Sequence, residues 1–92
     1  MPTLYDLATA ASHAVERART DAHEAHFRDV PAALVRLGAA RDRFDDLCRM
    51  KTLAQRAHAA VERGERVLLV LPRHITSDDV VAMLTTWPTL VA

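Results

Sequence analysis

The residues of this 92-residue chain that could bind a metal ion are its five histidines and twelve acidic residues. His23 and His26 lie three residues apart and share one face of a predicted helix. Structural zinc takes four protein ligands, and catalytic zinc usually takes three protein ligands and water. This pair therefore indicates an exposed helix end more than a metal centre.

A second candidate set comes from two predicted helices. His13 and Glu16 share a face of the first helix, and Asp42 and Asp45 share a face of the second. A hairpin would bring these pairs to one height and form half of the carboxylate and histidine pattern of di-metal four-helix bundles, which a dimer would complete. The alternative function is thus a metal-dependent enzyme or sensor on a dimeric helical bundle. Three arginines are spaced to pair with the same carboxylates, so we expect no metal or cofactor: Arg17, Arg41 and Arg49.

Other catalytic patterns are not found in the sequence. Ser12 and His13 are neighbours that point in different directions on a helix, and no serine has the flanking glycines of a nucleophile elbow. Gly38 and Gly64 are the only glycines, so no glycine-rich phosphate loop is present. Cys48 is the only cysteine, which excludes an intramolecular disulfide and suits a reducing compartment. We expect no enzymatic activity.

A line of arginines offers a further alternative. Arg49, Arg56 and Arg63 are spaced by seven residues and lie on one side of the second helix. Such a line suits a nucleic-acid-associated protein, but the formal net charge is zero and no aromatic residues alternate with the arginines. A solvated helix face is the favoured interpretation, and nucleic acid is not the expected partner.

The central element of the predicted fold is an amphipathic helix within residues 39–63. Its apolar residues recur at steps of three or four and fall on one face: Ala40, Phe44, Leu47, Met50, Ala54, Ala57 and Val61. We expect one helix from about Pro31 to Arg63, with a kink at Gly38 as the alternative, and with Gly64 as its left-handed terminating residue.

An alanine-rich helix precedes this element. It begins at Thr3, whose hydroxyl and the Asp6 carboxylate form a capping-box pattern. The short turn before Pro31 predicts an antiparallel hairpin over residues 3–63, with Phe44 and Leu47 against the region of residues 11–15.

The remaining residues predict a small strand-helix-strand tail, 65–92. Val67–Leu71 is a continuous apolar run typical of a buried strand, and Thr89–Ala92 is expected as a second short strand. Thr76 and Asp79 match a capping box, which starts a helix that runs to about Thr86. The predicted fold is therefore mainly α (α+β), a single domain of residues 1–92.

The predicted strand also gives the favoured function. A two-stranded sheet is marginal in water, so its free edge requires another chain. Trp87 either plugs the core or anchors a partner, and we favour the anchor. The expected contact residues are Val67, Leu69, Leu71, Met83 and Trp87.

These features predict a non-catalytic protein–protein interaction module. Half of the residues are apolar, but many are alanine, so the core is thin and a second subunit would compensate. We expect a homodimer that acts as an adaptor or inhibitor of a larger protein. The N-terminus has no leader pattern and no apolar run reaches the ~18 residues of a membrane span, so we expect a cytoplasmic protein without membrane contact.

Overall fold

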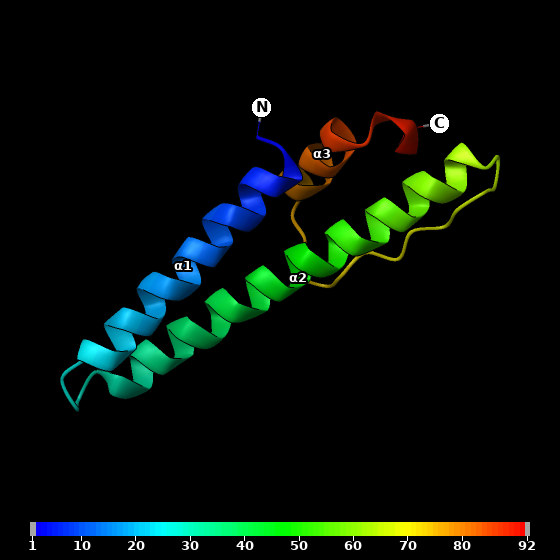
Figure 1. The fold of residues 1–92 in the computed structure, drawn as a ribbon. Coiled ribbons are helices and arrows are strands. Elements are labelled where there is room, and N and C mark those ends of the chain that lie inside the picture. Colours follow the sequence, from blue (N-terminus) through cyan, green and yellow to red (C-terminus); the bar gives the residue numbers. More distant parts are fainter. Residues whose placement is uncertain (1, 92) are drawn as a thin grey trace.

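The fold is a long helical hairpin whose C-terminal tail folds back onto it. A computed structural model describes residues 2–91. Its elements are α1 (Leu4–Glu24), α2 (Val30–Glu62), α3 (Ser77–Thr86) and the short 3-10 helix η1 (Pro88–Leu90). Figure 1 shows α1 and α2 antiparallel, with α3 beside the N-terminal end of α1. The mainly helical fold and the hairpin agree with the prediction. No helix of residues 2–91 is long and apolar enough to cross a membrane.

The first helix begins where the capping pattern places it. The backbone N–H of Asp6 donates to Thr3 Oγ1 at 3.2 Å, and the N–H of Thr3 donates to Asp6 Oδ2 at 2.9 Å. These bonds satisfy two donors that a helix start would otherwise leave free. Leu4 and Ala11 are the buried residues of α1, and the small side chain of Ala11 permits close approach to α2.

The second helix continues through Gly38 as one element of 33 residues. Four residues of the predicted apolar face are buried, together with two residues upstream of Ala40 on the same helix: Ala33, Leu37, Leu47, Met50, Ala54 and Ala57. Leu47 lies in one core cluster with Ala11, and Phe44 packs against that cluster as a half-buried side chain. Since α1 has only 21 residues, α2 extends beyond it and leaves apolar surface for the tail to cover.

Gly64 ends α2 through a Schellman motif. Its φ is 80°, in the left-handed region that only glycine adopts without strain. The N–H of Gly64 donates to the Val61 carbonyl at 2.9 Å, and the N–H of Glu65 donates to the Ala60 carbonyl at 3.0 Å. The chain consequently reverses direction at a defined residue and runs back along α2 (Figure 1).

The two predicted tail strands are wrong. Among residues 2–91 none forms a strand, and residues 88–90 form η1 in place of most of the second strand. Ala92 lies outside the described residues. A strand requires a ladder of hydrogen bonds to another extended segment, and with Pro88 beginning a 3-10 turn no such segment lies beside residues 67–71. Residues 66–71 are therefore an unpaired extended segment.

The tail completes the hydrophobic core. Side chains from both hairpin helices and from the tail form one buried cluster: Leu4, Ala11, Leu47, Met50, Ala54, Met83 and Trp87. Trp87 also stacks at a tilt against Tyr5, with 5.8 Å between ring centroids. The tail from Ile75 to Leu90 thus contributes to the same core as the hairpin.

Candidate protein-interaction surface

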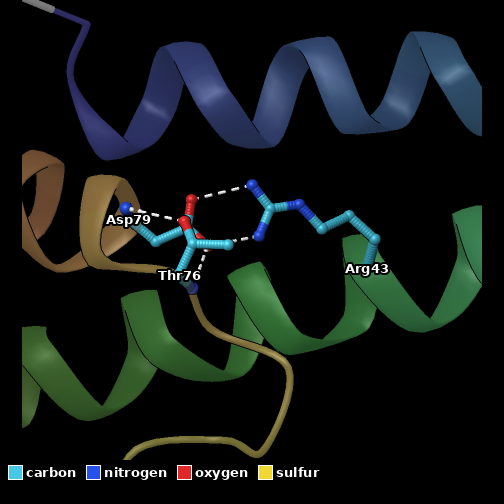
Figure 2. Close-up of polar contacts among 3 residues, drawn as sticks. All are labelled: Arg43, Thr76 and Asp79. Atoms are coloured by element: carbon cyan, nitrogen blue, oxygen red, sulfur yellow. Dashed lines mark hydrogen bonds and ion pairs between the residues drawn. The ribbon is translucent and has the colours of Figure 1, made fainter.

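An ion pair between α2 and the start of α3 anchors the tail (Figure 2). Arg43 Nη2 donates to Asp79 Oδ1 at 2.7 Å, and Nη1 donates to Oδ2 of the same carboxylate. The Asp79 side chain is 1% exposed, whereas that of Arg43 is 36% exposed. A two-pronged contact of this kind fixes orientation as well as distance. The beginning of α3 is therefore held in one position on α2.

Asp79 has a second role, as the partner of the N-cap residue Thr76 in the capping box of α3. Its Oδ2 accepts the N–H of Thr76 at 2.9 Å, and its own N–H donates to Thr76 Oγ1 at 3.3 Å. The predicted capping box is confirmed. The hydrogen bond from Arg43, more than the bonds of Thr76, keeps the pKa of Asp79 below its usual value, although burial opposes this shift. Asp79 is thus charged at neutral pH despite its burial.

Two further hydrogen bonds hold the end of the tail. The N–H of Leu4 donates to Thr86 Oγ1 at 3.0 Å, which satisfies a free donor at the start of α1. His58 Nδ1 and Thr89 Oγ1 are hydrogen-bonded at 2.6 Å, and the histidine tautomer determines which of the two atoms is the donor. The segment between Gly64 and Ile75 is therefore held at both ends. The Schellman motif fixes its beginning, and the Arg43–Asp79 ion pair at the start of α3 fixes its end.

The extended segment, residues 66–71, has one covered face and one exposed face. Leu69 and Leu71 are half-buried and pack against the core cluster. Leu68 and Val70 point away and are 89% and 76% exposed, and Val67 is 40% exposed. Side chains that alternate in this way are characteristic of a strand lying on a core. Its outer face is apolar and uncovered.

The main chain of the extended segment is also free. Within residues 2–91, no backbone N–H or C=O of residues 66–71 takes part in a hydrogen bond. Unpaired extended backbone is a template for the addition of another strand. A hollow of about 420 Å³ lies beside it, lined by Ala57, Val61, Glu65, Arg66, Val67, Leu69, Thr89 and Leu90. The segment therefore offers main-chain bonding groups next to an apolar depression.

No family model, curated protein or solved structure matches the chain. Evidence about function therefore comes from the surface of the molecule itself. The extended segment combines free main-chain groups with exposed large apolar side chains.

The predicted contact residues fall into two groups. Val67, Leu69 and Leu71 belong to the extended segment, whereas Met83 and Trp87 are 3% and 8% exposed and lie in the core. Trp87 occupies the position of a core plug, the less favoured of the two predicted roles. Contact of these five residues with a partner stays a prediction.

The two most exposed apolar residues of the segment, Leu68 and Val70, are not among the predicted contact residues. Their exposure follows from the alternation of side chains along extended backbone. Because Leu69 and Leu71 face the core, Leu68 and Val70 must face away from it. The continuous apolar run concealed this alternation, since it is typical of a strand that is buried on both faces.

The predicted metal residues do not form a metal-binding cluster within residues 2–91. His13, Glu16, Asp42 and Asp45 are all exposed, and within residues 2–91 no group of three or more metal-ligating side chains is placed to hold an ion. Asp46 is buried, and its Oδ2 has no partner in this part of the chain. The dimeric metal bundle stays a prediction.

The arginine line is partly engaged by carboxylates. Arg63 Nη2 lies 3.1 Å from Glu65 Oε2, and Arg49 Nη1 lies 4.0 Å from Asp46 Oδ1. Arg56 is exposed. Exposed ion pairs of this kind are weak, so these arginines could still bind other anions. Contact with nucleic acid stays a prediction.

Proposed function

We propose that this chain is a non-catalytic protein–protein interaction module that binds an extended stretch of another polypeptide along residues 66–71. The observation that carries the proposal is the extended segment itself, whose backbone is unpaired and whose outward side chains are apolar. Addition of a strand to such a backbone is a common mode of peptide recognition, in which main-chain hydrogen bonds supply affinity and side chains supply specificity.

Pre-organisation supports this mode of binding. Fixing the backbone of a flexible residue costs roughly 1 to 2 kcal/mol, so a loop that must first become extended binds weakly. Here the Schellman motif at Gly64 and the Arg43–Asp79 ion pair hold the two ends, and Leu69 and Leu71 hold the middle against the core. The backbone of this segment thus loses most of its conformational entropy when the chain folds, before a partner binds.

The proposed biological role is that of a homodimeric adaptor or inhibitor of a larger protein in the cytoplasm. A strand added at residues 66–71 would cover Leu68 and Val70 only along one edge, and their outward faces would remain available for the larger protein. The zero net charge fits recognition by shape and apolar contact rather than by long-range attraction.

Selection from a library of random dodecapeptides displayed on phage tests the proposal. We expect enrichment of peptides with alternating apolar residues and no proline, because such sequences form strands. The double substitution Leu68→Lys/Val70→Lys should weaken their binding by about tenfold or more, as loss of two apolar contacts at the centre of an interface would.

The matched control is Leu34→Lys/Val35→Lys, since these residues are also exposed apolar side chains but lie near the start of α2. It should leave peptide binding unchanged. Failure to enrich any peptide, or equal binding by the two double variants, would contradict the proposed function.

A further inference from the structure

We infer that the strand added to the extended segment is the same segment of a second copy, antiparallel and centred on Leu69, so that the Glu65 carboxylate of each copy meets the Arg73 guanidinium of the other. This inference rests on the proposed function and specifies the partner at the same surface. It follows from the residues at the two ends of the segment, from the position of Pro72 and from the exposure of the charged groups.

Charge complementarity selects the register. When Leu69 faces the partner's Leu69, Val67 faces the partner's Leu71 and Glu65 faces the partner's Arg73. A shift by one residue in one direction places Arg66 opposite the partner's Arg73, and a shift in the other direction places Arg66 opposite an apolar leucine. Opposite charges that face each other across two strands stabilise the pair, and like charges destabilise it. Of these registers, only the one centred on Leu69 pairs opposite charges at both ends.

The position of Pro72 agrees with this register. In a strand, the main-chain groups of alternate residues point to opposite edges. Pairing centred on a bonded Leu69 uses the edge that also carries the groups of Val67 and Leu71. Pro72 has no N–H, but its main-chain groups belong to the other edge. The N–H groups of Val67, Leu69 and Leu71 that this pairing uses are therefore present and form no hydrogen bond within residues 2–91. The N–H of Glu65 stays bonded to the Ala60 carbonyl, so Glu65 meets Arg73 through its side chain alone.

The two charged residues are accessible for this contact. Arg73 is exposed and, within residues 2–91, forms no ion pair. Glu65 is also exposed and holds Arg63 at 3.1 Å. A carboxylate has room for about four hydrogen bonds, so Glu65 accommodates a second arginine without releasing the first.

Two-fold pairing also limits the assembly. Each copy uses the same edge, so the contact closes on itself and gives a dimer rather than a growing fibre. Such closure protects an unpaired apolar backbone, which would otherwise be a site of aggregation.

Complementary charge reversals test the register, with the dimer constant measured by sedimentation equilibrium. The wild-type chain should dimerise. Glu65→Arg alone and Arg73→Glu alone should each weaken dimerisation about three- to tenfold, because each places like charges together twice per dimer. An equimolar mixture of the two variants should form a heterodimer about as tightly as the wild type, since both of its end pairs are again opposite in charge.

Arg36→Glu, an exposed charge reversal on α2 outside the segment, is the matched control and should leave the dimer constant unchanged. Circular dichroism of each variant checks that helicity is kept. A monomeric wild type that still binds selected peptides would overturn self-pairing and the homodimer, and would leave the proposed binding of an extended polypeptide intact. A dimer constant that neither reversal changes would overturn the register. So would a mixture of the two variants that dimerises no more tightly than either variant alone. Absence of both dimer and peptide binding would overturn both proposals.

Discussion

Replacing Leu47 by alanine is expected to lower the free energy of unfolding by about 2 to 5 kcal/mol. Leu47 is completely buried at the centre of α2, in the cluster where the hairpin and the tail meet. Its loss removes apolar contacts and leaves a cavity that long helices cannot close by relaxing. Because a domain has a net stability of only roughly 5 to 15 kcal/mol, this change alone would unfold a large fraction of a marginal chain.

Urea denaturation followed by circular dichroism measures this effect. Leu34→Ala is the matched control, because the same side chain on the same helix is 54% exposed there. We expect the control to shift stability by about 0.5 kcal/mol or less, as is usual for surface sites. Equal losses for the two variants would mean that the buried face of α2 does not carry the core.

The second large effect is expected for Asp79→Ala, which should cost about 2 to 4 kcal/mol. The substitution breaks the partly buried ion pair with Arg43 and also removes the carboxylate half of the capping box of α3. Arg43 is partly exposed and can regain water, so the loss should fall below that of a fully buried pair. Asp6→Ala is the matched control, because Asp6 fills the same capping position in α1 without an ion pair. It should cost about 1 kcal/mol.

The pH dependence of stability distinguishes the ion pair from the cap. Since the Arg43 hydrogen bond lowers the pKa of Asp79, the unfolded chain takes up a proton at this carboxyl at higher pH than the folded chain. Its contribution is complete above the usual pKa near 3.8 and is lost as the pH falls through the folded value. The urea midpoint of Asp79→Ala should therefore fall less steeply as the pH is lowered into the acid range than the midpoint of Asp6→Ala. Identical slopes would contradict a charged pair at this position.

The helices could be predicted because their signals are local in the chain. Both capping boxes join residues three positions apart, and Gly64 supplies the backbone conformation that ends α2. The apolar face around Leu47 repeats with the period of a helix. Each of these features depends on neighbouring residues, so it is visible in the sequence alone.

The tail was harder to predict because its structure depends on distant contacts. The apolar run at 67–71 predicted a strand, but whether a second segment pairs with it is decided elsewhere, by the 3-10 turn at Pro88. The Arg43–Asp79 ion pair joins residues 36 positions apart, and no spacing rule connects them. The burial of Trp87 likewise follows from the arrangement of α1, α2 and the tail in space.

The most direct test of the central claim is amide hydrogen exchange, measured by NMR residue by residue across positions 66–71. In the dilute free chain these amides should exchange rapidly, because none of them is hydrogen-bonded in the described structure. At concentrations that favour the dimer, the amides of Val67, Leu69 and Leu71 should become protected while those of Leu68 and Val70 remain fast. Strong protection already in the dilute monomer, or no change when a peptide or a second copy is added, would contradict the account of this segment as a binding edge.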